Sequence, residues 1–192
     1  IDTRGKQQAK VNFAAVPFPI RCLIGFGAVD SANMTALALN TLLSDKKLRE
    51  SVQPICLLGA YFKHHDIVEK LLDSFIKSKI VRNCSSVLEL PYTCDIAIGA
   101  PGVSHAERLY AGIPTVLVPQ NDKHVALCMG WENERCALYA RPEPQHIAIQ
   151  INALIANQLE RAKAISMEGQ RVIDGKGASR ILSELIIRNL IT

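Results

Sequence analysis

The stretch from Cys94 to Glu107 contains residues that could bind an anion. It reads C-D-I-A-I-G-A-P-G-V-S-H-A-E, so a short apolar run leads into a loop of small residues and then to Ser104, which we expect to open a helix. A small-residue loop between a buried strand and a helix presents backbone N–H groups and the positive end of the helix dipole to an anion. Glu107, one turn into that helix, could accept hydrogen bonds from ribose hydroxyl groups.

The same two polar residues also fit a purely structural role. Ser104 is a suitable N-cap, and Glu107 stands three residues further on, which is the spacing of a capping box. On this loop alone, helix capping and ligand binding both stay open for Ser104 and Glu107. His105 between them could reach the ligand or lie on the solvated face of the helix.

The composition is typical of a single globular domain with a full core. The chain has 192 residues, of which 48% are hydrophobic and 21% are charged, and this excludes a disordered chain. A net charge of +4 with scattered Lys and Arg, together with only 5% aromatic residues, disfavours a nucleic-acid-binding surface. Apolar runs stay well short of the roughly 18 residues that a transmembrane helix needs, so we expect no membrane span.

Neither the cysteines nor the histidines have the spacing of a metal site. The six cysteines form no Cys-x-x-Cys pair, and three of them lie in apolar strand-like runs, which indicates reduced thiols and a cytoplasmic protein. His64 and His65 are adjacent and would not share one face of a helix. We therefore expect no metal and no cofactor.

Apolar runs of strand length alternate along the chain with segments of helical periodicity. We expect strands at 20–27, 52–59, 80–81, 95–98, 115–119 and 137–140, and helices at 34–43, 64–76, 85–90, 104–111, 122–135, 144–157, 160–166 and 178–190. Residues 1–19 are expected to be a linker or interdomain segment, which leaves 20–192 as the domain. Such alternation predicts an α/β fold, a doubly wound parallel sheet of the Rossmann-like type.

Two glycine-containing loops are expected to converge in this fold. Doubly wound sheets bind ligands at the carboxyl ends of their strands, at the point where the strand order reverses. The loops at Gly27 and Gly102 follow two such strands. If the strand order is 3-2-1-4-5-6, both loops border the same crevice.

Four motifs together resemble the UDP-sugar hydrolases of the pseudaminic acid pathway. The family segments are F-G-G-x-D…N-x-T, G-x-[ST]-x-x-E, A-L-G-[IL]-P and D-G-x-G-x-x-R-I. They correspond here to Phe26-Gly27-Ala28-Val29-Asp30 with Asn33-Met34-Thr35, to Gly102–Glu107, to Ala111-Gly112-Ile113-Pro114 and to Asp174–Ile181. The similarity covers roughly residues 20 to 188, with the motifs in the family's order.

The resemblance implies the C-terminal, nucleotide-binding domain of a two-domain GT-B fold, which is also the fold of the glycosyltransferase that makes lipid II. The pyrophosphate of a UDP-sugar would lie on the loop at Gly102, Glu107 would bind the ribose, and the turn after Gly27 would line the same cleft. The residues implied to contact nucleotide or sugar are Gly27, Ala28, Asp30, Gly102, Val103, Ser104, Glu107, Lys123 and His124.

The family's catalytic His lies in its N-terminal domain, and nothing in this chain corresponds to that domain. The resemblance therefore implies a partner domain, and a chain that binds a UDP-sugar on its own without turning it over. A glycosyltransferase half, and a nucleotide-sugar sensor or interaction module without catalysis, are the alternatives.

This chain departs from the family pattern at three places. Pro101 replaces a glycine and removes one backbone N–H donor. Ala28 replaces the second glycine of F-G-G, which limits backbone approach if that position needs a positive φ. Lys123 and His124 stand where the family has Asn-Gln, and they either contact sugar or phosphate or form an exposed helix start.

Near the C-terminus, Asp174 and Arg180 flank a turn with two glycines. We expect a structural ion pair between the two side chains across that turn. A contact with the sugar is the less favoured reading.

Overall fold

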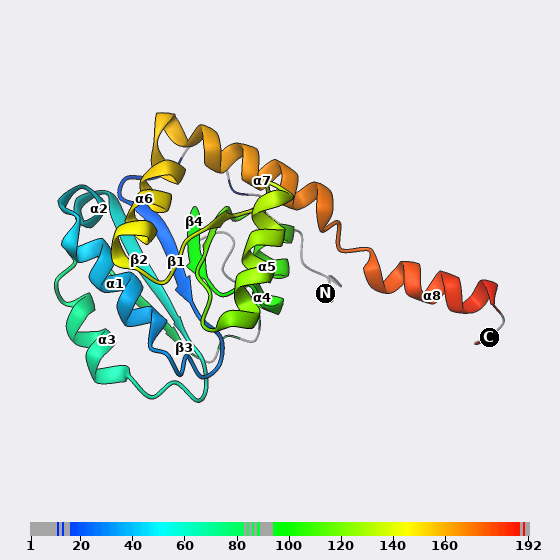
Figure 1. The fold of residues 1–192 in the computed structure, drawn as a ribbon, viewed down its shortest axis with the longest axis horizontal. Coiled ribbons are helices and arrows are strands. Elements are labelled where there is room, and N and C mark those ends of the chain that lie inside the picture. The colour runs from blue at the N-terminus through cyan, green and yellow to red at the C-terminus, as the bar shows by residue number, and fades with distance from the viewer. Residues whose placement is uncertain are drawn as a thin grey trace.

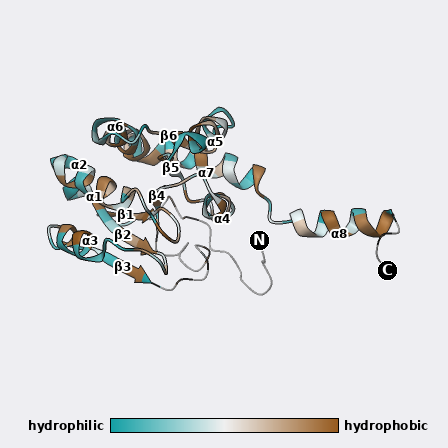
Figure 2. Cartoon of the chain, turned by 60° about the horizontal axis from the view of Figure 1, so that its bottom comes forward, coloured by the Kyte–Doolittle hydropathy of each residue, from teal (hydrophilic) through white to brown (hydrophobic). Residues whose placement is uncertain are grey.

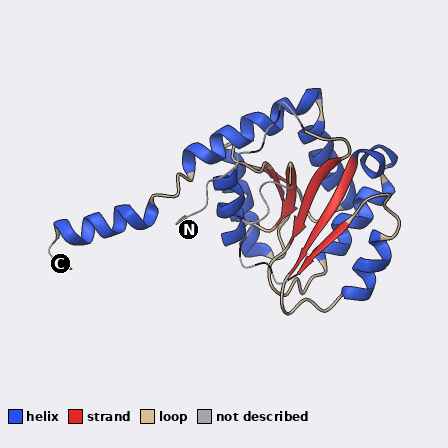
Figure 3. Cartoon of the chain, turned by 180° about the vertical axis from the view of Figure 1, so that it is seen from behind, coloured by secondary structure: helices blue, strands red, loops and turns tan. Residues whose placement is uncertain are grey.

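The computed structural model describes residues 11, 13, 16–82, 84, 86, 88, 94–188 and 190. Its centre is a sheet in the order β3-β2-β1-β4-β5-β6 in which all strand pairs are parallel (Figures 1 and 3). The strands are β1 Ile20–Gly25, β2 Val52–Leu58, β3 Lys79–Arg82, β4 Ile96–Gly99, β5 Thr115–Leu117 and β6 Leu138–Tyr139. This order confirms the predicted doubly wound, Rossmann-like α/β fold.

Helices cover the sheet on both faces. They are α1 Met34–Ser44, α2 Lys46–Ser51, α3 His65–Leu72, α4 Val103–Ala111, α5 Asp122–Asn133, α6 Pro144–Ile155, α7 Glu160–Val172 and α8 Gly177–Ile187, with a 3-10 turn at Asn157–Leu159. Cys22 and Ile24 of β1 belong to the core cluster that α1, α3 and α6 complete, whereas Leu23 packs with Ala111 of α4. Because side chains alternate along a strand, α4 lies on the opposite face from α1.

One helix was missed, the ends of two predicted helices were wrong, and the predictions at two further segments lie largely outside the described residues. The helix α2 was missed, although Asp45 caps it by accepting a hydrogen bond from the Leu48 N–H at 3.1 Å. The third helix ends at Leu72 rather than at 76, and α7 runs on to Val172 rather than ending at 166. Most of the predicted helix at 85–90 and of the segment 1–19 is outside the described part of the chain.

The last helix, α8, extends away from the domain (Figure 1). None of its residues is buried, and its apolar side chains, such as Ile181 and Ile187, are exposed. Figure 2 shows hydrophobic residues along this helix. Before it, the Arg180 guanidinium donates to the Asp174 carboxylate at 2.7 Å, which confirms the predicted ion pair. In the part of the chain that the structure describes, no helix has both the length and the apolarity to cross a membrane.

Candidate functional site

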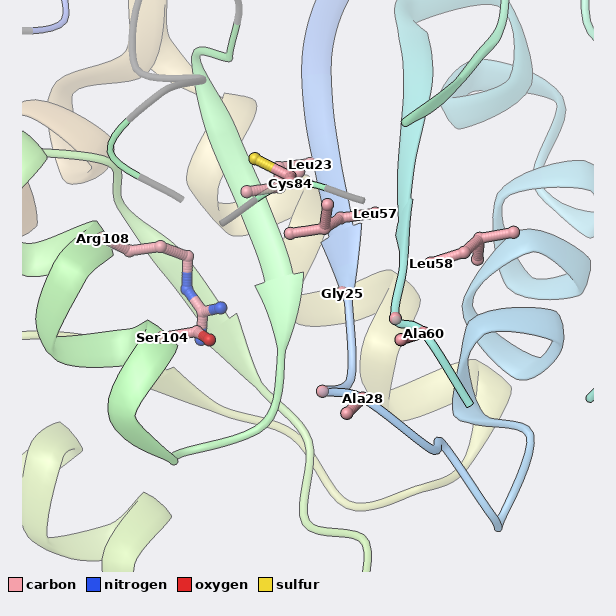
Figure 4. Close-up of a pocket in the computed structure, with 11 residues that line it drawn as sticks. Leu23, Gly25, Ala28, Leu57, Leu58, Ala60, Cys84, Ser104 and Arg108 are labelled. Carbon is pink, nitrogen blue, oxygen red and sulfur yellow. The ribbon is translucent and has the colours of Figure 1, made fainter. Parts of the chain in front are cut away.

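The two predicted loops lie side by side because β1 and β4 are neighbours in the sheet. Gly25 pairs with Gly99, so the loops that follow both strands leave the sheet at one edge. A cavity of about 300 Å³ lies at this edge, on the α4 face of the sheet (Figure 4). Its lining residues are Leu23, Gly25, Gly27, Ala28, Leu57, Leu58, Gly59, Ala60, Cys84, Ser104 and Arg108.

Close contact between the loops after β1 and β2 shapes one wall of this cavity. Gly27 has φ 87°, a conformation that favours glycine. The Tyr61 N–H donates to the Ala28 carbonyl at 3.0 Å, and a Cβ atom added to Gly59 would lie 2.3 Å from the Ala28 Cα. Glycine at position 59 therefore permits the backbone approach that holds Ala28 at the cavity.

Asp30, a predicted ligand residue, caps helix α1. Its carboxylate is buried and accepts hydrogen bonds from the backbone N–H groups of Met34 at 2.8 Å and Thr35 at 2.9 Å. These are N–H groups that have no partner inside the helix. The first turn of α1 is thus closed by a protein carboxylate, and Asp30 is not among the residues that line the cavity.

The N-terminus of α4 lacks such a cap. The helix begins at Val103 with Gly102 as its N-cap, and none of the described side chains caps it there. The prediction that Ser104 is the N-cap of a capping box was therefore wrong. The Gly102 backbone is already extended, and its carbonyl accepts from the His105 N–H at 2.8 Å, so the helix starts earlier and places Ser104 inside its first turn.

Glu107 contacts the segment that follows β3. Its Oε1 accepts a hydrogen bond from the Ser86 hydroxyl at 3.0 Å, across 21 residues of sequence. Glu107 therefore ties α4 to that segment rather than capping its own helix. Its contact with ribose stays a prediction.

Arg108 is a residue of the site that the sequence analysis missed. It is only 1% exposed, although arginine is rarely buried without a charged partner. Its Nη2 donates to the Ala100 carbonyl at 2.8 Å, while its buried Nε has no hydrogen-bond partner among the described residues. Arg108 follows Ser104 by four residues, so both side chains lie on the same face of α4 and both line the cavity (Figure 4).

Burial perturbs the ionisation of both Arg108 and His105. Removal from water lowers the pKa of Arg108 to about 10, so the guanidinium keeps its charge at neutral pH. His105 was predicted to reach the ligand or to be solvated; the solvated alternative was wrong, and His105 is not among the residues that line the cavity. It is fully buried with its ring against Trp131, and burial, together with the charge of Arg108, holds its pKa well below the usual value.

Lys123 and His124 lie in the first turn of α5 and do not line this cavity. The Asn121 side chain caps that helix by accepting from the His124 N–H at 3.2 Å. Gln120 Nε2 donates to the Phe26 carbonyl at 2.8 Å, which joins the loop after β5 to the end of β1. A second cavity of about 460 Å³ is lined by Gln120 itself, together with residues such as Met34 and Tyr139.

Within the described ranges, no group of three or more His, Cys, Asp or Glu side chains is arranged to hold a metal ion. The charged group that faces the first cavity is instead Arg108. The arrangement is chemically suited to an anionic ligand, because it combines a buried cation with the uncapped N-terminus of α4.

Comparison with known proteins by sequence gives one partial match. Over 104 residues the chain is 36% identical to an uncharacterized protein of Methanocaldococcus jannaschii. The match covers 52% of this chain and 21% of that protein, so the chain spans about a fifth of the curated relative it matches. No family model matches the chain.

Comparison by structure identifies the fold. MurG of Acinetobacter baumannii has a TM-score of 0.64 at 16% identity, covering 84% of this chain and 50% of MurG. The rhamnosyltransferase SpnG complexed with thymidine diphosphate has a TM-score of 0.63 at 16% identity, covering 84% and 42%. HepE of Anabaena in complex with UDP and glucose has a TM-score of 0.63 at 15% identity, covering 88% and 47%. The domain has the fold of a Rossmann-like half of GT-B glycosyltransferases, and the chain spans half or less of each of these proteins.

Proposed function

We propose that this chain is the UDP-sugar-binding half of a GT-B-type enzyme. The observation that carries the proposal is the cavity lined by β1, β2 and α4, which is bordered by the first turn of α4 and by the buried Arg108. A ligand with a charged diphosphate and a less polar nucleoside fits these surroundings, because Leu23 and Leu57 line the same cavity as Arg108.

In this proposal the diphosphate lies on the first turn of α4. The backbone N–H groups of Val103 and Ser104 are in the part of a helix that has no intrahelical partner, and they donate to the phosphate oxygens. Ala28 and Gly27 approach from the opposite wall with backbone atoms. The Glu107 carboxylate, which accepts from Ser86, is the group that we assign to the ribose hydroxyl groups.

We propose Lys123 and His124 as contacts of the sugar or its phosphate from the first turn of α5. They do not line the cavity at α4, so a UDP-sugar bound there would have to extend toward the loop after β5 to contact them. Gln120 already joins that loop to β1, which supports one continuous binding edge.

The reaction that we propose for the complete enzyme is hydrolysis of a UDP-sugar in the pseudaminic acid pathway. Water attacks the anomeric carbon, the bond from that carbon to the phosphate oxygen breaks, and UDP leaves with its developing charge held at α4. Four motifs of the hydrolases support this reaction. The general base would be a His of an N-terminal partner domain, and the chain's span of about half of the GT-B structures supports such a partner.

The second candidate function is a glycosyltransferase half, in which an acceptor hydroxyl replaces water. The fold likeness to MurG and SpnG favours it. The two reactions differ in their products, so incubating the complete protein with a UDP-sugar separates them: release of free sugar without an acceptor indicates the hydrolase, and turnover that requires an acceptor indicates the transferase.

We also propose a cytoplasmic location. All six cysteines are free of disulfides, and five of them are buried in the core, which fits a reducing compartment.

Calorimetric titration of the chain with UDP tests the proposed function, and separate titrations with CDP and GDP are the controls for selectivity. We expect UDP to bind more tightly than CDP or GDP, and the Glu107→Ala variant to weaken binding by about tenfold, as for loss of a charged hydrogen bond. Glu50→Ala is the matched control, because Glu50 is an exposed carboxylate of α2 at the opposite edge of the sheet. No binding of UDP by the wild-type chain would contradict the proposal.

A further inference from the structure

The cavity at α4 is lined by a buried positive charge that forms no ion pair with the described residues. Arg108 is buried, its Nη2 is used on the Ala100 carbonyl, and its Nε has no partner among the described residues. Within those residues no carboxylate lies within ion-pair distance of it, although the charge of the neighbouring Glu107, which accepts from Ser86, partly offsets the lowering of the Arg108 pKa by burial. A buried charge without a partner costs free energy, so this site is poised for an anion.

The Arg108 guanidinium lies against the end of β4 and the loop that follows it. Arg108 reaches back along α4, and a Cβ atom added to Gly99 would lie 3.0 Å from its Nη1, so the guanidinium rests against the end of β4. Figure 4 shows it next to Ser104, on the side of α4 that faces the cavity. Pro101, in the same loop, has no N–H to offer a phosphate.

We propose that Arg108 is the buried counter-charge for the diphosphate of the nucleotide ligand, and that it replaces from within the helix the donor that Pro101 lacks. The inference rests on the proposed function and names a residue of that same site. Arginine suits this role because its planar fork can hold a carbonyl with one nitrogen and a phosphate oxygen with others. The uncapped first turn of α4 supplies the remaining donors.

The alternative is that Arg108 only fixes the loop by holding the Ala100 carbonyl. A structural role of this kind would affect the whole cavity, and therefore uridine and UDP alike. A counter-charge affects only ligands that carry phosphate. The ratio of the UDP and uridine affinities therefore separates the two roles.

The test is titration of the wild-type chain and of Arg108→Met with UDP, uridine and inorganic pyrophosphate. We expect Arg108→Met to weaken UDP and pyrophosphate binding by about 10- to 100-fold, the range for a charged hydrogen bond, and to leave uridine within about twofold. Methionine is flexible and apolar, so the variant should fold at least as well as the wild type. Arg49→Met on the exposed face of α2 is the matched control and should change none of the three affinities.

The outcomes separate the inference from the proposed function. If the wild type does not bind UDP, the proposed function fails and the inference fails with it. If the wild type binds UDP and Arg108→Met binds it equally well, or loses uridine and UDP in equal measure, the proposed function stands and Arg108 is not the counter-charge.

Cys84 offers a second measurement that reports on the cavity itself. It lines the cavity and is partly exposed, while the other five cysteines are buried. We expect saturating UDP to slow modification of the wild-type chain by iodoacetamide, with Cys84→Ser identifying the modified thiol. UDP binding that leaves the Cys84 rate unchanged would place the nucleotide elsewhere and overturn the inference.

Discussion

Helices α1 and α4 follow neighbouring strands of the same sheet, yet their N-termini are built differently. The first turn of α1 is closed by the buried Asp30 carboxylate, which accepts from two backbone N–H groups. The first turn of α4 follows the N-cap Gly102, is capped by no side chain among the described residues and borders a cavity with Arg108. The comparison shows that two similar strand–loop–helix segments use the first turn of the helix differently. A carboxylate closes it in α1, whereas our proposal assigns the donors of α4 to a ligand.

The largest effect that we predict is on the free energy of unfolding, and it follows from the Asp30 cap of α1. Asp30→Ala should reduce the free energy of unfolding by about 2–3 kcal/mol, because it removes two hydrogen bonds to a buried carboxylate. Urea denaturation measures the change. Asp45→Ala is the control, since Asp45 caps the short helix α2 at a partly exposed position and should cost less. An equal loss in both variants would mean that the buried Asp30 cap stabilises the protein no more than the partly exposed Asp45 cap does.

The next prediction concerns a substitution that adds an N-terminal cap to α4. Gly102→Asp should add a carboxylate cap to α4, weaken UDP binding by at least about tenfold and stabilise the fold by about 0.5 kcal/mol. The substitution fits, because an added Cβ at Gly102 meets open space and the backbone there is extended. Gly102→Ala is the matched control and should retain binding. Gly102→Asp with unchanged UDP affinity would show that the first turn of α4 does not hold the phosphate.

The third prediction concerns pH and the buried His105. Its pKa is lowered in the folded state, so the unfolded chain binds a proton below about pH 6.5 that the folded chain does not, and stability falls as the pH falls. The slope should approach about 1.4 kcal/mol per pH unit below pH 6, and His105→Leu should flatten it. Denaturation series between pH 7 and 5 test this. The same slope in both proteins would assign it to other groups.

The smallest predicted effect lies at the turn before α8. Arg180 and the Lys176 N–H lower the pKa of the Asp174 carboxyl to about 2, so any stability from this pair is present above the ordinary value near 3.8 and is lost as the pH falls toward 2. Both side chains are solvent-exposed, so salt should weaken the effect. NMR titration of the Asp174 carboxyl should show its pKa rising in Arg180→Ala. No change would mean that the ion pair is not formed in solution.

The fold could be predicted because its strands carry a strong local signal. The run Ile96-Ala97-Ile98 and its counterparts are continuously apolar, as strands covered on both faces must be, and amphipathic segments separate them. The helix α2 has six residues and one buried side chain, Leu48, which is too little for periodicity to reveal. Its signal was the capping residue Asp45.

The site could be predicted only in outline. Gly27, Ala28 and Ser104, which were singled out from strand ends and small residues, line one cavity, and their contact with a nucleotide stays a prediction. The roles of Asp30 and Arg108 were harder to predict. A carboxylate near a glycine turn can cap a helix or bind a ligand, and an arginine in a helix normally reaches solvent. Their roles depend on which neighbours the fold brings to them. The spacing of four residues between Ser104 and Arg108 was the one local signal that could have found the buried charge.

The central claim is that the N-terminus of α4, and not that of α1, receives the phosphate. Amide NMR spectra of the chain titrated with UDP test it most directly. We predict that the backbone N–H signals of Val103 and Ser104 and the side-chain Nε–H signal of Arg108 shift strongly, while those of Met34 and Thr35 stay in place. Shifts at Met34 and Thr35 with none at α4 would contradict the account.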